Sequence, residues 1–463
     1  MGQQPITQPI RVVYDTKSFA YRSKMWLAYV SMFGLICGDG LRYALGWVGF
    51  GIWSGVLFIA LCIMLVRSKP LATLKRVPWY LWALFAALTV SALLSSYQVL
   101  SLLAVGVTLI TTSFAVWLAA AFDWRLIHRV LANSLRAAIF GSLIFEFVAA
   151  TIVRGPIPPI FKNYEGDVPP SRAYYWTQGN LFNGDRIQGI LGNANLLAYA
   201  AMLGLIIFAI EYAIKASVRW LSVVSLIASA ICLALAKSAG IAFAVTAVIA
   251  TAIVSIAAEG KDYETRHRYY RVAWSVAGVI GFLVLSFRAE VFSFLGKSPD
   301  MTGRTMIWRK VLGLIPERPL QGYGWLSYWV PGVKPYEGLV VIHHVPYYQA
   351  HNAFLDMWLQ GGLFALLAFV TLVVFTFVKL WQLAVRHTSA LYLWPILVFV
   401  GLIVQNFTES RLLTESGWAL LMLFAIKVYE PSDLLEPVGR TPKRARLLGL
   451  GLRRNQLQQQ TDR

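Results

Sequence analysis

Long apolar runs alternate with short polar segments along most of this sequence. Twelve runs approach or exceed the roughly 20 residues that a helix needs to cross about 30 Å of hydrocarbon. The first is the weakest, because Asp39 and Arg42 crowd its end. The pattern predicts an all-α, polytopic integral membrane protein with about twelve transmembrane helices, near 25–41, 47–66, 79–96, 99–121, 131–153, 191–213, 218–236, 240–258, 272–287, 352–378, 389–406 and 413–428.

Composition supports a membrane protein. Hydrophobic residues make up 58% of the 463, only 14% are charged, and the mean hydropathy is +0.61. A soluble domain carries about 25% charged residues, so this chain could not cover itself with a surface suited to water. The 17 Trp, 21 Tyr and 26 Phe suit aromatic belts at two membrane interfaces. Cys37, Cys62 and Cys232 lie within apolar runs, which indicates no disulfide framework.

Basic residues predict the orientation of the chain, because cytoplasmic loops carry an excess of Lys and Arg. With a cytoplasmic N-terminus, the segments on the inner side contain Lys24, Arg67, Lys69, Lys75, Arg76, Arg125, Arg129, Lys215, Arg219, Lys261, Arg266, Arg268, Arg271, Lys379, Arg386 and the tail from Lys427 to Arg463. Every short loop then alternates as the rule requires, and both termini are cytoplasmic. The formal charge of +19 therefore reflects orientation in a membrane, and we expect no nucleic-acid partner.

These observations divide the chain into three parts. We expect a cytoplasmic segment over 1–24, a transmembrane domain over 25–430 and a basic cytoplasmic tail over 431–463. No cleavage pattern typical of a signal peptide follows the first apolar run, so the first transmembrane helix is expected to direct insertion itself.

Two long loops, at about 154–190 and 288–350, fall on the outer side. They are rich in aromatic residues, Gly and Pro, and loops of this length and composition are often functional. In the second loop, "GRTMIWRKVLGLIP" predicts an amphipathic helix that ends before Pro316 and lies on the outer membrane surface. Its apolar face would hold Ile307, Trp308, Val311, Leu312 and Ile315.

Polar residues gather near the outer ends of the predicted helices. They are Arg186, Asn193, Asn195, Lys237, Ser238, Arg288, Arg304, His343, His344, His351, Asn352, Glu409, Arg411 and Glu415. Polar groups at membrane depth are costly unless water, protein or a substrate satisfies them. All of these fall on the same side in the predicted topology, so a single cavity could gather them.

The chemistry of this side favours an anion. Helices that enter from it present free N–H groups and the positive end of their dipole, and arginine offers paired donors to phosphate oxygens. The natural membrane-borne anion is a lipid diphosphate, and Arg186, Arg304, Arg288, Lys237 and Arg411 are candidates to bind it. The arginines could instead anchor the chain at the interface.

His351 is the candidate for acid–base chemistry. Beside a helix N-terminus and arginines its charged form is disfavoured, so a neutral imidazole able to accept a proton is expected. It could instead form a hydrogen bond that docks its helix. Its neighbour Asn352 could bind substrate. A metal site built from His343, His344 and His351 has suitable atoms but no recognised spacing.

The other polar residues have structural alternatives too. Asn193 and Asn195 could bind substrate, or cap or pack the helix after 191. Glu409 and Glu415 could simply pair with Arg411.

Several motifs are missing from the sequence. It has no Walker loop, no dinucleotide fingerprint and no D-x-D pair. A transporter would show interrupted helices at mid-membrane in paired halves, whereas here the polar residues crowd one face. Chemistry at that face would require an activated donor already in the bilayer.

Five motifs, in order, resemble the pattern of the bacterial O-antigen ligase and polymerase superfamily. They are "RIQGILGNANLLA", "KSAG", "TGRTMIW", "PLQGYG" and "HNAFLDMWLQGG", and the resemblance runs from about Arg186 to Glu415. The amino-terminal helices agree with it only in number and hydropathy.

The resemblance implies a metal-independent glycosyltransferase without a cofactor, in the bacterial inner membrane, that uses undecaprenyl diphosphate-linked glycans at the periplasmic face. It implies that His351 is the functional histidine and that Arg186 and Arg304 match the family's arginines. Among its members the chain looks most like the ligase that transfers O-antigen polysaccharide to lipid A–core with inversion. A polymerase, a protein O-oligosaccharyltransferase or a glycan flippase is the alternative.

Overall fold

The computed structural model describes residues 18–67, 71–161, 171–286, 303–342, 345–387 and 389–430. Its longer helices are α1 (Phe19–Ile36), α2 (Gly38–Arg67), α4 (Trp79–Leu93), α5 (Gln98–Ala121), α6 (Trp124–Val148), α7 (Ala194–Ala213), α8 (Arg219–Ala236), α9 (Ala239–Ala257), α10 (Tyr263–Ser286), α13 (Ala353–Arg386), α14 (Trp394–Gln405) and α15 (Glu415–Lys427). Shorter elements are α3 (Leu71–Leu74), α12 (Arg304–Leu314), the π-helix η1 (Ala149–Val153), and the strands β1 (Val341–Ile342) and β2 (Val345–Pro346).

A helix overlaps each of the twelve predicted runs, and the all-α, multi-pass class is confirmed. Within the described residues, α2, α5, α6 with η1, α7, α8, α9 and α13 are long and apolar enough to cross a membrane alone. Helices α4 and α14 are apolar but shorter. The number of twelve membrane crossings therefore stays a prediction. The orientation of the chain and the cytoplasmic location of its terminal segments also stay predictions.

The first two helices differ from the prediction. Helix α1 begins at Phe19 and ends at Ile36, and α2 begins at Gly38, so Asp39 and Arg42 lie in the second helix. The predicted first span, 25–41, is wrong at both ends, because the break at Cys37 separates two helices that hydropathy alone had merged. After this break, Arg42 bonds both Asp39 and the carboxylate of Glu415 in the last helix.

Side chains on the bundle surface fit a hydrocarbon solvent. Helix α2 exposes Val48, Ile52, Val56 and Ile59, each at 60% or more. On a soluble monomer a continuous apolar surface of this kind would be unusual. We infer that this side of α2 faces lipid.

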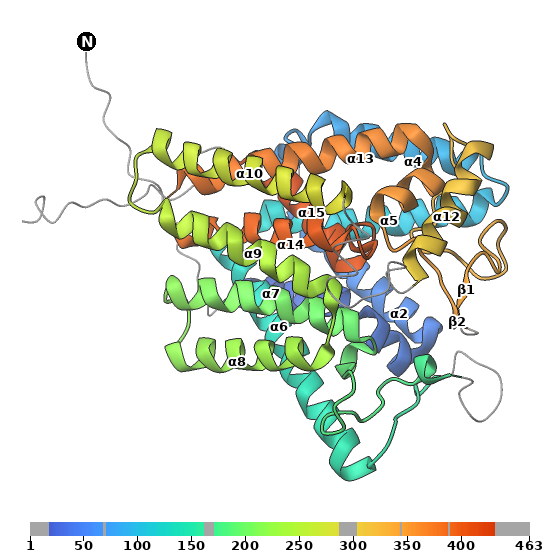
Figure 1. Ribbon diagram of the computed structural model, residues 1–463, viewed down its shortest axis with the longest axis horizontal. Coiled ribbons are helices and arrows are strands. Elements are labelled where there is room, and N and C mark those ends of the chain that lie inside the picture. The colour runs from blue at the N-terminus through green and yellow to red at the C-terminus, as the bar shows by residue number, and fades with distance from the viewer. Residues whose placement is uncertain are drawn as a thin grey trace, which may run out of the picture.

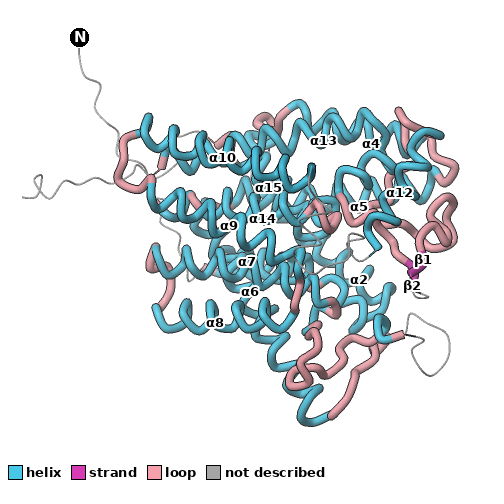
Figure 2. The backbone as a smooth tube through the Cα atoms, viewed as in Figure 1, coloured by secondary structure: helices cyan, strands magenta, loops and turns pink. Residues whose placement is uncertain are grey.

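The helices α7, α8, α9 and α10 lie side by side with roughly parallel axes, and α12 and the β1–β2 hairpin lie at one end of the bundle (Figure 1). The longer irregular segments gather at the same end (Figure 2). The predicted collection of both long loops on one side is therefore present in the fold.

The amphipathic helix exists, but its apolar face packs on protein. Ile307, Val311 and Ile315 of α12 and the turn after it are buried in a small core with Tyr323 and Trp329. Pro316 follows the end of α12 and lies in a single 3₁₀ turn. The expectation that this face rests on the membrane is wrong for those side chains, and Leu312, predicted on it, is 49% exposed. Periodicity locates an apolar face but does not identify what covers it.

The second outer loop is fastened to α13 through two glycines. Helix α13 is interrupted at Gly362, where φ is +77°. Near this break the carbonyls of Leu359 and Gln360 accept hydrogen bonds from Tyr323 N and Gly324 N, at 3.0 and 2.9 Å. A Cβ on Gly322 would lie 2.4 Å from the Gln360 carbonyl oxygen. The "PLQGYG" and "LQGG" motifs therefore meet backbone to backbone, which only glycine permits.

Candidate active site

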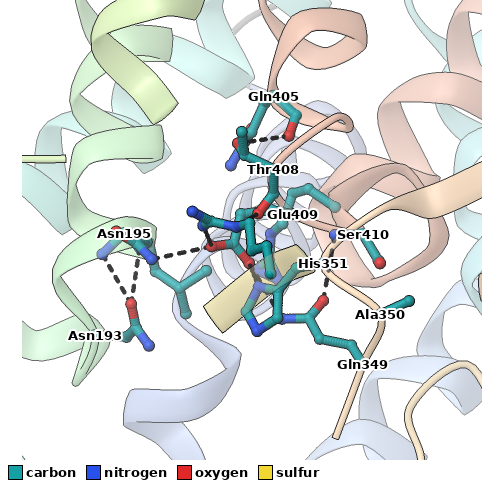
Figure 3. Close-up of polar contacts among 12 residues, drawn as sticks. Asn193, Asn195, Gln349, Ala350, His351, Gln405, Thr408, Glu409 and Ser410 are labelled. Atoms are coloured by element: carbon teal, nitrogen blue, oxygen red, sulfur yellow. Dashed lines mark hydrogen bonds and ion pairs between the residues drawn. The ribbon is translucent and has the colours of Figure 1, made fainter. Parts of the chain in front are cut away.

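Five segments converge at the loop-rich end of the bundle. Figure 3 shows the start of α7, the loop before α13 and the loop between α14 and α15. The turn between α8 and α9 and the start of α12 join them through Ser238 and Arg304. The polar residues predicted to share one side include members of every segment. The structure brings Asn195, Arg304 and His351 to Glu409, and Arg186 and Ser238 join this hydrogen-bonded network through Asn195.

His351 contacts a carboxylate. Its Nδ1 lies 2.8 Å from Glu409 Oε2, and its ring lies edge-to-face with Tyr347 at 5.5 Å between centroids. With the proton on Nδ1, the imidazole donates to Glu409 and keeps a lone pair on Nε2, the nitrogen that can act as a base. The backbone of His351 has a φ of +50°, a left-handed conformation that side chains rarely adopt outside functional or strained positions.

Glu409 receives four donors. Its Oε2 also accepts from Gln349 Nε2 at 3.2 Å, and its Oε1 accepts from Asn195 Nδ2 at 3.0 Å and Arg304 Nη2 at 3.2 Å. Burial raises the pKa of this carboxyl, but His351, Arg304 and Arg411 together outweigh burial and leave the pKa below its ordinary value of 4.5. Glu409 is therefore ionised at neutral pH.

These contacts bear on two sequence-based expectations. The alternative that Glu409 simply pairs with Arg411 is wrong, because Glu409 binds His351 and Arg304 instead. The sequence placed a helix N-terminus and arginines beside His351, and the carboxylate of Glu409 lies there as well. Residues 351 and 409 are 58 positions apart, so nothing local in the sequence indicated that this carboxylate would reach the ring.

Arg304 and Arg186 join the network from two segments, the start of α12 and the loop before α7. Arg304 Nε donates to the Thr408 carbonyl at 3.0 Å. Arg186 donates through Nη2 to Asn195 Oδ1 at 2.6 Å and through Nε to the Ala236 carbonyl at 2.8 Å. Burial, and then the charge of Arg304, lower the pKa of Arg186, while Glu409 acts against them. Arg304 contacts Glu409 directly and Arg186 reaches it through Asn195, so two guanidinium groups share one network, which favours an anion beside them.

Comparison with known protein families gives a match. Residues 190–370 match the family model described as O-antigen ligase. This match covers less than half of the chain and supports a protein of the O-antigen ligase/polymerase superfamily. No curated protein matches the sequence. Members of the superfamily are glycosyltransferase-like membrane enzymes that process lipid-linked O-antigen. The matched range includes Asn195, Lys237, Arg304 and His351, and it leaves Glu409 beyond its end.

Arg411 and Glu415, which follow Glu409 closely in the chain, form a second cluster with Arg42. Arg411 Nη2 and Arg42 Nη2 bind the two oxygens of Glu415 at 2.9 and 2.8 Å. Arg411 also donates to Tyr328 Oη at 3.2 Å, and its side chain is 5% exposed. The pairing of Arg411 with Glu415 is confirmed, whereas Arg42 was not predicted, because it lies 373 residues from its partner.

Three predicted substrate ligands have structural contacts. Asn193 and Asn352 cap α7 and α13, each accepting two backbone N–H bonds on its side-chain oxygen. Lys237 donates to the Gly184 carbonyl and thereby ties the turn after α8 to the first outer loop. Substrate contact by these residues remains a hypothesis.

Some predicted residues lie outside the described part. Arg288, His343 and His344 are among them, so the structure tests neither Arg288 as a ligand nor the three-histidine metal site. Among the described residues, no group of three His, Cys, Asp or Glu side chains is placed to share a metal ion.

A buried carboxylate, Asp356, fastens the loop that carries His351 to the loop that carries Glu409. It accepts from Ala350 N at 2.9 Å, from Trp329 Nε1 at 2.9 Å and from the hydroxyl of Ser410. It is 0% exposed and lies in the first turn of α13. In the sequence, only the position of Asp356 shortly after His351 indicated that it could belong to the site.

Replacing Asp356 with alanine is therefore expected to destabilise the protein in detergent. Three buried donors would lose their partner, at a cost of about 2–4 kcal/mol in total. Thermal unfolding followed by near-UV circular dichroism measures this effect. Exposed Glu337→Ala, in the loop before α13, is the control. An equal midpoint for Asp356→Ala and the control would contradict the fastening role.

Proposed function

We propose that this protein is an O-antigen ligase of the bacterial inner membrane, with its active site on the periplasmic side. It transfers O-antigen polysaccharide from undecaprenyl diphosphate to a sugar hydroxyl of lipid A–core. The observation that carries the proposal is the His351–Glu409 pair at 2.8 Å, which Arg304 contacts directly and Arg186 reaches through Asn195. A general base and a cationic pair are what glycosyl transfer from a lipid diphosphate requires.

In the proposed reaction, His351 Nε2 removes the proton from the acceptor hydroxyl. The hydroxyl oxygen attacks the anomeric carbon of the first donor sugar, and the bond from that carbon to the diphosphate oxygen breaks. Direct displacement inverts the configuration at the anomeric carbon. Glu409 holds the imidazole in the tautomer that has a free lone pair on Nε2 and stabilises the imidazolium that forms.

The lipid diphosphate leaves as an anion. Arg186 and Arg304 stabilise the charge that develops on it, and because protein contacts already orient both side chains, little reorganisation is needed during the reaction. Arg288, Lys237 and Arg411 are further candidates to bind the diphosphate. The substrates are expected to reach the site within the membrane.

Transfer by this site is expected to be independent of divalent metal. Each nearby carboxylate is already occupied by donors: Glu409 by four, Glu415 by two arginines and Asp356 by three. Purified enzyme with excess EDTA should therefore keep its rate of transfer to a soluble core acceptor in detergent. A loss of rate with EDTA that returns on adding Mg²⁺, Mn²⁺ or Zn²⁺ would overturn this site.

Reconstitution is the test of the proposal as a whole. Purified protein with lipid-linked O-antigen and lipid A–core should yield the ligated product. Product made only when a second lipid-linked repeat serves as the acceptor would instead identify a polymerase. A flippase would form no new glycosidic bond in detergent.

Glu409→Gln tests the orienting carboxylate. Each carboxylate oxygen of Glu409 accepts two hydrogen bonds. The glutamine side chain has only one acceptor oxygen, so whichever way it is turned, its NH₂ group faces two donors and loses both hydrogen bonds. We expect kcat to fall by about 10²-fold, as for the loss of an oriented general base, with a smaller change in KM.

The pH profile of this variant gives a second readout. The pKa of Glu409 is lowered, so the stability that its ionised form contributes is present above pH 4.5 and is lost only as the pH falls through that lower value. Glu409 therefore stays ionised over the neutral range, and the loss of its contribution at low pH should be absent from the Glu409→Gln variant. An unchanged kcat would remove Glu409 from the mechanism.

A further inference from the structure

A hollow outside the Glu409 network lies where the first outer loop meets the end of α6. These two segments are teal and green in Figure 1. The hollow has a volume of about 760 Å³, and it is open to the exterior. The wall includes Thr151, Arg154, Gln178, Phe182 and Asn183. The proposed reaction uses none of these residues.

The walls of the hollow are held by hydrogen bonds. Ile157 N donates to the Thr177 carbonyl, and Trp176 N donates to the Ile157 carbonyl, both at 2.8 Å. The buried Glu146 of α6 accepts from Thr177 Oγ1 at 2.8 Å and from Gly189 N at 2.7 Å. The lining includes Ala150 and Thr151 of the π-helix η1, and π-helices are frequent at functional sites. The hollow is therefore a preformed feature of the fold.

Its lining suits a hydroxyl-rich ligand better than a lipid chain. Gln178 and Asn183 carry amides that can both donate and accept, and Arg154 adds a cationic donor. Phe182 offers an aromatic ring that is 69% exposed. Sugars present hydroxyls at their edges and apolar C–H groups on their faces, so amides beside an aromatic ring match both.

The hollow is close to the proposed diphosphate site along the chain. Asn183 precedes Arg186 by three residues, a span of at most about 11 Å, and Asn180 Nδ2 donates to the Arg186 carbonyl at 3.3 Å. The side chain of Arg186 extends from this loop to Asn195, to which its Nη2 donates a hydrogen bond. A donor whose diphosphate contacts Arg186 thus places its glycan near the hollow.

We propose that the hollow is a subsite for the glycan of the donor, which holds the sugars that follow the diphosphate. The inference rests on the proposed function. It adds residues that would recognise the sugars of the donor, whereas Arg186 and Arg304 would recognise its diphosphate. The acceptor also carries sugars, so the two glycan sources must be distinguished experimentally.

Kinetics with two donors test the proposal. The Phe182→Ala/Asn183→Ala double variant is compared with wild type, using lipid diphosphate that bears either the long glycan or a single sugar. The ratio of kcat/KM for the long donor to that for the short donor should fall about tenfold. Ile160→Ala, at a position 70% exposed on the same loop but outside the hollow, is the control and should leave the ratio unchanged. An unchanged ratio in the double variant would overturn the subsite.

Direct binding separates this proposal from the reaction. Lipid-free O-antigen oligosaccharide should give saturation-transfer NMR signals with the wild-type protein and weaker signals with the double variant. Signals from core oligosaccharide alone would overturn the assignment to the donor, and no signal from either glycan would overturn the subsite. Repeat-unit binding without any transfer would leave the subsite standing and overturn the proposed ligase activity.

Discussion

His351→Ala is expected to lower kcat by about 10²–10⁴-fold, the range typical of losing a general base. The variant removes the ring whose Nδ1 binds Glu409 and whose Nε2 would accept the acceptor proton. Transfer from lipid-linked glycan to lipid A–core, quantified by gel or mass spectrometry, measures the effect. KM for the donor should change less, because Arg186 and Arg304 remain in place.

Backbone strain could confuse this result, because position 351 has a φ of +50°. Alanine in that conformation costs about 1–2 kcal/mol, whereas asparagine tolerates it. His351→Asn should therefore fold as wild type and be as inactive as the alanine variant. His267→Ala is the matched histidine control, since His267 stacks on Trp381 toward the other end of α13. Near-normal turnover in a folded His351→Asn protein would exclude His351 as the base.

Arg304→Lys is expected to lower kcat/KM by about 10–100-fold although it keeps the charge. Arg304 donates hydrogen bonds from Nε to the Thr408 carbonyl and from Nη2 to the Glu409 carboxylate, at 3.0 and 3.2 Å. One ammonium cannot hold both contacts and also offer paired donors to phosphate, and losing a charge-assisted bond costs about 1.5–3 kcal/mol. Initial rates over a range of donor concentrations give the value.

The matched control is Arg309→Lys, an exposed residue on the same helix, which should retain full activity. If Arg304→Lys were also fully active, the site would need only a positive potential, and the directional contact that we assign to guanidinium would be wrong.

Much of the fold followed from the sequence because the hydrocarbon core imposes a local rule. Every backbone polar group must be bonded within its own helix, so long apolar runs become helices wherever they occur. A helix overlaps each predicted run. The expectation that the polar ends of these helices gather at one end is met for Asn195, Arg304 and His351, because alternating helices return to the same side.

The contacts within the site depended on tertiary structure. Glu409 lies 58 residues from His351 and 214 from Asn195, and Arg42 reaches Glu415 across 373. Periodicity carries no information about such pairs, because which loops meet depends on how the helices pack.

Local breaks in the helices were likewise not predictable from the sequence. The break at Cys37 that brings Arg42 to Glu415, and the approach of Gly322 to the interrupted helix at Gly362, arise from contacts that no apolar window detects. The sequence by itself determined the helices and the kinds of polar group at one end. Only the tertiary structure decided that a carboxylate, and not arginines alone, lies against His351, because close packing brings distant loops within hydrogen-bonding distance.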